Sequence, residues 1–342
     1  MKGPWRVLAI LAAGVVVAAT LAAQAPAPAA TATSAAAETT PAATAPSLAP
    51  ATTPANSSAP VPYALGRHWT DPQGKPLPFG SEAELLDFLR TAKVLSVSRL
   101  GGGINFPKKV LLEKDGIQAN AVFRDVNEEK NTPTFGGGRN ELFFKDSYIF
   151  EPAAYELGMM LGLDNVPPAT LRKYDRTNGS IQIFIENAIN ERKEVEEHLK
   201  PPDDQEWKKQ VQMMNVFDAL ICNVDRNRGN IIITPDWRLW MIDHSRAFRR
   251  NTDLQSQSPI NQCERSLYTK LKALDEKEAR KRLKDYLTTF ELDALFTRRK
   301  LLLERIDKLI AEKGENQVLY DFVWFAPKNV GKSAEETAGK PQ

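Results

Sequence analysis

The stretch between residues 24 and 62 restricts most strongly what this chain can fold into, because it consists almost wholly of Ala, Pro, Thr and Ser. From Val7 to Gly66 the only charged residue is Glu38. This composition has too little apolar bulk to offset the entropy that ordering would cost. We therefore predict a Pro-stiffened, disordered linker over residues 26–62. Roughly 260 of the 342 residues then remain for a globular part that begins near residue 63.

The first 25 residues have the pattern of an export signal. Lys2 and Arg6 precede an uncharged apolar run of 17 residues, from Val7 to Ala23, which is the charged-then-apolar order of such signals. A run of this length lies at the lower limit for a membrane-spanning helix, so a cleaved signal peptide and an uncleaved membrane anchor both stay open. In either case we expect the globular part to be exported, to a periplasm, a secretory lumen or the outside of the cell.

Charge and cysteine content exclude several classes of function. The chain has 45 basic and 43 acidic residues and a formal net charge of +2. Nucleic-acid-binding proteins usually carry a clear basic excess, so we expect no nucleic-acid partner. Two cysteines cannot build a disulfide-dense scaffold or a four-thiolate zinc site. At this point Cys222 and Cys263 can equally form a disulfide or stay as two buried thiols.

The first half of the globular part reads as mainly β structure. Ser81 has the features of a helix cap and is followed by apolar residues over 85–89. Asp115-Gly116 is a turn signal between two apolar runs and predicts a β-hairpin. The further elements expected here are strands at 95–100, 169–174 and 180–185, a loop at 131–140, and an amphipathic helix at 150–163.

The second half reads as mainly helical. Asp203 introduces a helix from Trp207 to Cys222, whose apolar residues recur at helical spacing. Two short apolar strands follow at 231–234 and 239–242, separated by a Pro-Asp-Trp turn. Helices are then expected as far as about residue 313.

Three polar residues carry the strongest chemical signal. Asp225 and Asn230 are five positions apart, and Asp243 follows Asn230 by thirteen, after the predicted hairpin. This is the spacing of the kinase catalytic loop, in which the first Asp receives the proton of the attacking hydroxyl and the other two residues hold a metal ion. A tight hairpin returns the chain to the same edge, so Asn230 and Asp243 are expected to meet at one divalent cation. The alternative is that all three serve turns and caps, where Asp and Asn are common.

Together with two other stretches, these residues give the chain a resemblance to the atypical kinase superfamily, which includes phosphatidylinositol 3- and 4-kinases, HipA-type kinases and secretory-pathway kinases. The stretches span about residues 95–248 and read NVDRNRGN with IDHSRAF, EPAAYELGMMLGLDNVPPAT, and LGGGINFPKKVLLEKDGIQANAVFRDV. The resemblance implies an α+β, two-lobed protein-kinase-like fold. Its mainly β N-lobe would cover residues 63–186 and its mainly helical C-lobe residues 187–325, followed by a flexible tail at 326–342.

The resemblance also implies where a nucleotide would bind. Gly101, Gly102 and Gly103 would belong to the loop over the phosphates, where backbone N–H groups approach the oxygens closely. Glu186 and Ala188 lie where the hinge between the lobes would give backbone hydrogen bonds to adenine.

Arg124 is a departure from the family pattern, because it occupies the place of a phosphate-gripping Lys. Arg also binds phosphate, but its planar fork needs different room. Lys108 or Lys109 can in principle reach in from the neighbouring strand. Glu151 would be the acidic partner of this cation, and Glu156 is the runner-up, because the proline after Glu151 perturbs the start of the helix.

The activity implied is the magnesium-dependent transfer of the terminal phosphoryl group of ATP to a hydroxyl. Asp225 would be the catalytic residue, and Asn230 and Asp243 would hold the metal. The acceptor, a lipid, a protein or a sugar, cannot be inferred from a fold, and a membrane is a partner only if the N-terminal segment stays uncleaved. Because Arg124 replaces the Lys, a catalytically silent pseudokinase module that binds a nucleotide or a partner is the alternative. A wall-associated structural protein ranks third.

Overall fold

The computed structural model describes residues 69–101, 107–130, 134–135, 139–140, 144–255 and 259–323. The predictions of a leader, a linker and a C-terminal tail, and those for Gly102 and Gly103, lie outside these residues. Within them, no helix is both long enough and apolar enough to cross a membrane.

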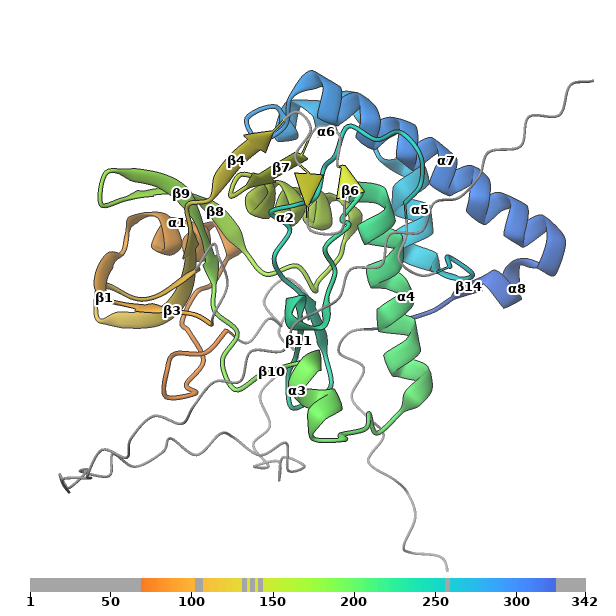
Figure 1. Ribbon diagram of the computed structural model, residues 1–342. Coiled ribbons are helices and arrows are strands. Elements are labelled where there is room, and N and C mark those ends of the chain that lie inside the picture. Colours follow the sequence, from red (N-terminus) through yellow and green to blue (C-terminus); the bar gives the residue numbers. More distant parts are fainter. Residues whose placement is uncertain are drawn as a thin grey trace, which may run out of the picture. The chain divides into compact units, whose positions relative to one another are not determined.

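A five-stranded antiparallel sheet dominates the first half of the described chain (Figure 1). The strands lie in the order β1 (Lys93–Arg99), β2 (Lys108–Lys114), β3 (Ile117–Arg124), β9 (Thr177–Ile183) and β8 (Ala169–Tyr174). The hairpin predicted at Asp115-Gly116 is confirmed, since it joins β2 to β3. Both turn residues have positive φ, 53° and 80°, as the tight turns that match strand twist require.

The side chains on the two faces of the sheet have different surroundings. Side chains alternate along β3, so Ala121 and Phe123 are buried against α1 (Glu82–Thr91), while Arg124 belongs to the opposite set. The Ser81 hydroxyl accepts a backbone N–H and caps α1, as predicted. The face with α1 therefore forms a core, and the other face is left to present Arg124.

The backbone next to Arg124 depends on a glycine. A Cβ on Gly179 would lie 2.5 Å from Phe123 Cζ and in contact with the Arg124 carbonyl oxygen. We therefore expect Gly179→Ala to destabilise the protein by about 1–3 kcal/mol, because the added methyl overpacks the sheet. Gly80→Ala is the control, since its nearest neighbour would be Glu84 Oε2 at an ordinary 3.5 Å. Urea denaturation of both variants checks this, and equal midpoints would contradict it.

An additional hairpin lies between β3 and the next helix. It consists of β4 (Asn127–Lys130) and β7 (Phe144–Ser147), with β5 (Thr134–Phe135) and β6 (Arg139–Asn140) between them. The prediction of a loop over 131–140 was therefore wrong for the four residues of β5 and β6, because strands of two residues have no periodicity to detect. The other residues of that prediction lie outside the described chain.

The second half is mainly helical (Figure 1). Its helices are α3 (Glu191–Glu196), α4 (Asp204–Ile221), the short 3-10 turn η2 (Arg228–Asn230), α5 (Arg265–Ala273), α6 (Glu276–Leu283), α7 (Thr289–Lys313) and α8 (Glu315–Val318). One further helix, α2 (Phe150–Leu161), lies earlier in the chain, between β7 and β8. Short strands complete it: β10 (Ile189–Asn190), β11 (Ile231–Ile233), β12 (Leu239–Met241), β13 (Cys263–Glu264) and β14 (Leu319–Tyr320). Asp203 caps α4 as predicted, because its carboxylate accepts two backbone N–H groups of the first turn.

Two hydrophobic clusters hold these elements together. One joins α1 to the sheet and includes Trp240 of β12. The other joins α2 to α4, α5 and α7, so α2 precedes the helical half in sequence but packs within it. Cys222 and Cys263 are both free and buried. The fold is thus α+β, with an antiparallel-sheet region first and a helical region after it, as expected.

Candidate active site

Asp225 and Asn230 belong to one compact turn after α4. The helix ends at Cys222, which adopts a left-handed conformation with φ 51°. The Asn230 side-chain NH₂ then donates to the Asp225 carbonyl oxygen at 2.9 Å. This contact leaves the amide oxygen of Asn230 as the atom able to ligate a cation.

The β11–β12 hairpin brings Asp243 back beside this turn, as the sequence predicts. Ile231 pairs with Met241, and the Ile242 N–H donates to the Asn230 carbonyl at 3.2 Å. Asp243 follows directly and has a φ of 60°, in the left-handed region that Asp and Asn tolerate better than most residues. The chain therefore changes direction at Asp243.

Arg226 holds the turn and the hairpin in register, a role that sequence reasoning missed. Its guanidinium is buried and forms two hydrogen bonds with the Asp218 carboxylate, at 2.8 and 3.0 Å. One further nitrogen donates to the carbonyls of Asn230, at 2.7 Å, and Ile242, at 2.6 Å. The sequence signal that was available is an Arg directly after Asp225, at a spacing of eight from an Asp within α4.

Arg124 lies between two carboxylates that come from different elements. Its Nη1 is 3.3 Å from Asp243 Oδ1, and its Nε is 3.8 Å from Glu151 Oε1. Glu156 instead pairs with Arg282 at the surface, at 2.6 Å. Of the two glutamates considered, the one that contacts Arg124 is therefore Glu151.

Glu151 is fully buried, so its charge requires partners. The His244 backbone N–H donates to it at 2.6 Å, the His244 ring lies 3.3 Å away, and Gln182 donates to it at 3.2 Å. Burial acts to raise the pKa of Glu151, but the contacts with His244 and Arg124 outweigh burial and hold the pKa at about 2, below its ordinary 4.5. The carboxylate is therefore ionised at neutral pH.

This pKa predicts a pH-dependent stability. Because the pKa is lowered in the folded state, ionised Glu151 contributes stability above pH 4.5, and this contribution is lost as the pH falls toward about 2. We expect Glu151→Gln to be less stable than wild type at pH 7, with a difference that shrinks below pH 4.5. Urea denaturation at a series of pH values measures the difference, with Glu156→Gln as the surface control. A difference that stays constant with pH would disprove the assignment.

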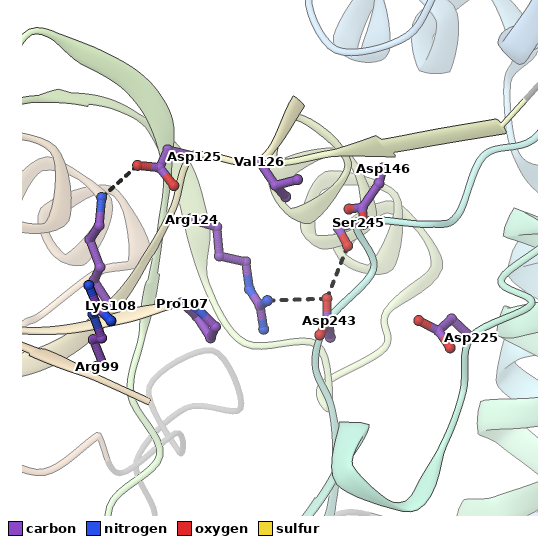
Figure 2. A pocket seen from close by; sticks show the side chains of 10 residues that line it. All are labelled: Arg99, Pro107, Lys108, Arg124, Asp125, Val126, Asp146, Asp225, Asp243 and Ser245. Atoms are coloured by element: carbon purple, nitrogen blue, oxygen red, sulfur yellow. Dashed lines mark hydrogen bonds and ion pairs between the residues drawn. The ribbon is translucent and has the colours of Figure 1, made fainter. Parts of the chain in front are cut away.

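A cavity of about 350 Å³ lies between the sheet and the turn that carries Asp225 (Figure 2). Asp225, Asp243 and Arg124 line it, as does Ser245, whose hydroxyl donates to Asp243 Oδ1 at 3.1 Å. Further lining residues that the sequence did not indicate are Arg99, Pro107, Asp125, Val126 and Asp146. Of the two lysines considered from the sequence, Lys108 is among the lining residues and Lys109 is not. The cavity thus combines carboxylates with cations, and both kinds of group are needed to bind a metal-complexed anion.

Asp225 lies at the side of the cavity formed by the helical half (Figure 2). Burial raises the pKa of its carboxyl group, the charge of Asp243 adds to this effect, and Arg246, with Nη1 3.5 Å from Asp225 Oδ2, opposes it. A carboxylate with a raised pKa is a better proton acceptor than an exposed one.

The described residues predicted for the loop and the hinge, Gly101, Glu186 and Ala188, are not among those that line the cavity. Gly101 has a φ of 69° and lies two residues after the end of β1. Glu186 is bound to the sheet, because Asn120 donates to its Oε1 at 2.6 Å and Lys109 Nζ lies 3.9 Å from its Oε2. Glu186 and Ala188 are absent from the described lining, so their predicted backbone contacts with adenine stay a prediction.

The oxygen ligands available at this site fit a hard cation. Asp243 and Asn230 offer a carboxylate and an amide oxygen, which are the groups that Mg²⁺ prefers. Across the described residues, no cluster of three or more His, Cys, Asp or Glu side chains is arranged to hold a metal. Proteins commonly bind Mg²⁺ through one or two carboxylates together with the oxygens of a phosphate ligand.

Comparison with known proteins gives a likeness in structure alone. No family model and no curated protein matches this chain. A structure of hydra Fam20 with sugar superposes with a TM-score of 0.55 at 15% identity, over 74% of this chain and 96% of that one. A Golgi casein kinase superposes with a TM-score of 0.52 at 16% identity, over 70% and 78%. The expected resemblance is confirmed at the level of the fold, and this chain has an atypical kinase-like fold.

Proposed function

We propose that this protein is a kinase-like phosphotransferase, which moves the terminal phosphoryl group of ATP, complexed with magnesium, to a hydroxyl acceptor. One observation carries the proposal: Asp225 and Asp243 line the same cavity as Arg124, in a kinase-like fold. Asn230 is attached to the backbone of Asp225 and adjoins the strand that leads to Asp243. Asn230 itself is not among the lining residues, but separate turn and cap roles give no reason for Asp225 and Asp243 to line one cavity.

Each residue has a distinct task in this proposal. Asp225 orients the acceptor hydroxyl and takes its proton as the new oxygen–phosphorus bond forms and the bond to the ADP oxygen breaks. Its raised pKa supports this task. Asn230 and Asp243 would hold the magnesium ion, which would neutralise charge on the phosphates. Arg124, which pairs with Glu151 and lines the cavity, would face the same phosphates.

A second candidate is a nucleotide-binding module without turnover. The ion pair of Arg124 with Asp243 favours it, because one oxygen of the metal-binding carboxylate is already engaged by a guanidinium. A metal ion would have to compete with that cation for Asp243 Oδ1. This candidate keeps the fold and the cavity but not the reaction.

Calorimetric titration with ATP and magnesium, followed by a phosphate-release and phosphate-transfer assay, separates the two candidates. Binding with magnesium-dependent turnover supports the phosphotransferase. Binding without turnover supports the silent module. If ATP neither binds nor raises the melting temperature, both are wrong.

The proposal extends to the acceptor class and the location. The two structural relatives are described with a sugar and as a casein kinase of the Golgi, so sugar and protein hydroxyls are the first acceptors to test, with a lipid hydroxyl as a third. We also propose that the domain acts after export, on the basis of residues 1–25. Fusing these residues to a reporter that is active only outside the cytoplasm tests this, and a silent fusion would contradict it.

A further inference from the structure

Asp225 and Asp243 each pair with a different arginine. Arg124 Nη1 lies 3.3 Å from Asp243 Oδ1, and Arg246 Nη1 lies 3.5 Å from Asp225 Oδ2. Asp225 lies on the side of Asp243 away from Arg124 (Figure 2). The proposed function relates Arg124 to the nucleotide phosphates but gives no role to Arg246, although Arg246 contacts the proposed catalytic carboxylate.

The guanidinium of Arg246 lies against an aromatic ring of the additional hairpin. Its Cζ is 5.2 Å from the centre of the Phe144 ring, and Phe144, the first residue of β7, is buried. Arginine stacks on aromatic faces, and its planar fork loses little freedom when it also binds a carboxylate. The contacts with Phe144 and Asp225 together fix where this guanidinium lies.

The backbone on both sides of Arg246 is attached to neighbouring elements. The Ser147 N–H of β7 donates to the Ser245 carbonyl at 2.8 Å. The Phe248 N–H donates to the carbonyl of Ile221, the last residue of α4, at 2.6 Å. The segment that carries Arg246 is therefore joined to the hairpin before it and to the helix that leads into the Asp225 turn.

The hairpin that carries Phe144 is itself anchored to the helical half. Lys145 Nζ lies 2.7 Å from Oε1 of Glu291 in α7, a carboxylate that is buried. The same ammonium is 4.8 Å from the centre of the Phe150 ring. A functional side chain is held most precisely when its supporting residues are themselves fixed, and Phe144 meets this condition.

The charges around Asp225 act in opposite directions. Burial raises the pKa of its carboxyl group, Arg246 lowers it, and the charge of Asp243 raises it. A side-chain hydrogen bond from Asn227, in the same turn, also favours the ionised form. A base must be ionised before it can take a proton. Arg246 is thus the cation that counteracts burial and the charge of Asp243.

We propose that Arg246 is a positioning residue for Asp225: held against Phe144, it orients the Asp225 carboxylate and keeps it ionised to receive the proton of the acceptor hydroxyl. The proposal rests on the proposed function, in which Asp225 is that proton acceptor. Arg246 is not among the residues that line the cavity, so it acts through Asp225 and not on a substrate. The alternative is an ordinary surface ion pair of little consequence.

The pKa of Asp225 can be measured directly, by NMR titration of the full chain labelled with ¹³C in the Asp carboxyl groups. The loss of one signal in Asp225→Asn assigns it. We expect Arg246→Met to raise this pKa by about 0.5–1 pH unit, because a cation beside the carboxylate is removed and the pair is partly exposed. Arg246→Lys keeps the charge and should raise it less.

The pH profile of kcat/KM for phosphate transfer gives a second readout. Its limb at low pH should move upward by the same amount in Arg246→Met, so that kcat/KM below the limb falls about 3- to 10-fold. Arg246→Lys should return the limb toward its wild-type position. A merely structural role would lower the rate at every pH and leave the limb in place, and that result would overturn the proposal.

Arg250→Met is the matched control. Arg250 belongs to the same segment and makes the same two kinds of contact, with Nη2 3.4 Å from Glu129 Oε1 and Cζ 5.6 Å from the centre of the Phe290 ring. Its side chain is 33% exposed, compared with 26% for Arg246. Because its partner is a carboxylate of β4, this variant should leave the pKa of Asp225 and the pH profile unchanged.

The titration does not depend on catalysis, so the two proposals can fail separately. If the pKa of Asp225 is the same in Arg246→Met as in wild type, the Arg246 proposal is wrong while the proposed function stands. If Arg246→Met folds poorly, Arg246→Gln also removes the charge, and an unchanged pKa in that variant has the same meaning. If wild type does not bind MgATP, the proposed function is wrong, and a raised pKa in Arg246→Met still supports the pairing that keeps Asp225 ionised.

Discussion

Replacing Asp243 with Asn is expected to reduce magnesium-dependent phosphate transfer by at least about 10²–10³-fold while the fold is kept. Asn has nearly the same shape and tolerates the left-handed backbone conformation of this position. Asn lacks the negative charge with which Asp243 would bind the cation. Removing one well-placed charged or polar group from an active site commonly lowers the rate by this factor. Alanine is a poorer choice, because the positive φ would strain it. Transfer of labelled phosphate from ATP, measured with and without magnesium, checks the result.

Asp236→Asn is the control for this experiment. Asp236 lies in the turn of the same hairpin but is exposed and does not line the cavity. Its substitution should leave transfer unchanged. Equal activity of wild type and Asp243→Asn would show that Asp243 holds no catalytic metal ion, and the proposed chemistry would have to be abandoned.

Replacing Arg226 with Met is expected to destabilise the protein by about 3–5 kcal/mol, because one partner of a buried ion pair is removed and the other keeps its charge. The side chains of Arg226 and Asp218 are only 4% and 10% exposed. The carbonyls of Asn230 and Ile242 also lose a donor, so transfer activity should fall as the site loses its register. Urea denaturation gives the stability change.

Two further variants make the Arg226 prediction sharper. Arg282→Met removes a surface pair with Glu156 and should cost less than about 1 kcal/mol. The double variant Arg226→Met with Asp218→Asn removes both buried charges and should recover part of the loss. If Arg226→Met is no less stable than Arg282→Met, the buried pair does not hold the turn to the hairpin.

Local sequence patterns were sufficient to predict most helices and strands of the fold. The hairpin at Asp115-Gly116, the capped helix after Ser81 and the helix after Asp203 were all predictable, because turns and caps depend on neighbouring residues. The same holds for the return of Asp243 to the side of Asn230, since a short hairpin allows little else. The strands β5 and β6 were not predictable, because two residues are too few to show an alternating pattern and these strands form only by pairing with each other.

By itself, the sequence determined the order of strands and helices and the approach of Asn230 to Asp243, since both follow from contacts between residues close in the chain. The tertiary structure decided which distant side chains meet. It selected Glu151 over Glu156 as the partner of Arg124, and it placed the ammonium of Lys108 over Phe123 and that of Lys109 over Phe184. The physical reason is that these outcomes depend on how α2 packs and where each strand ends, and that packing is a property of the whole folded chain.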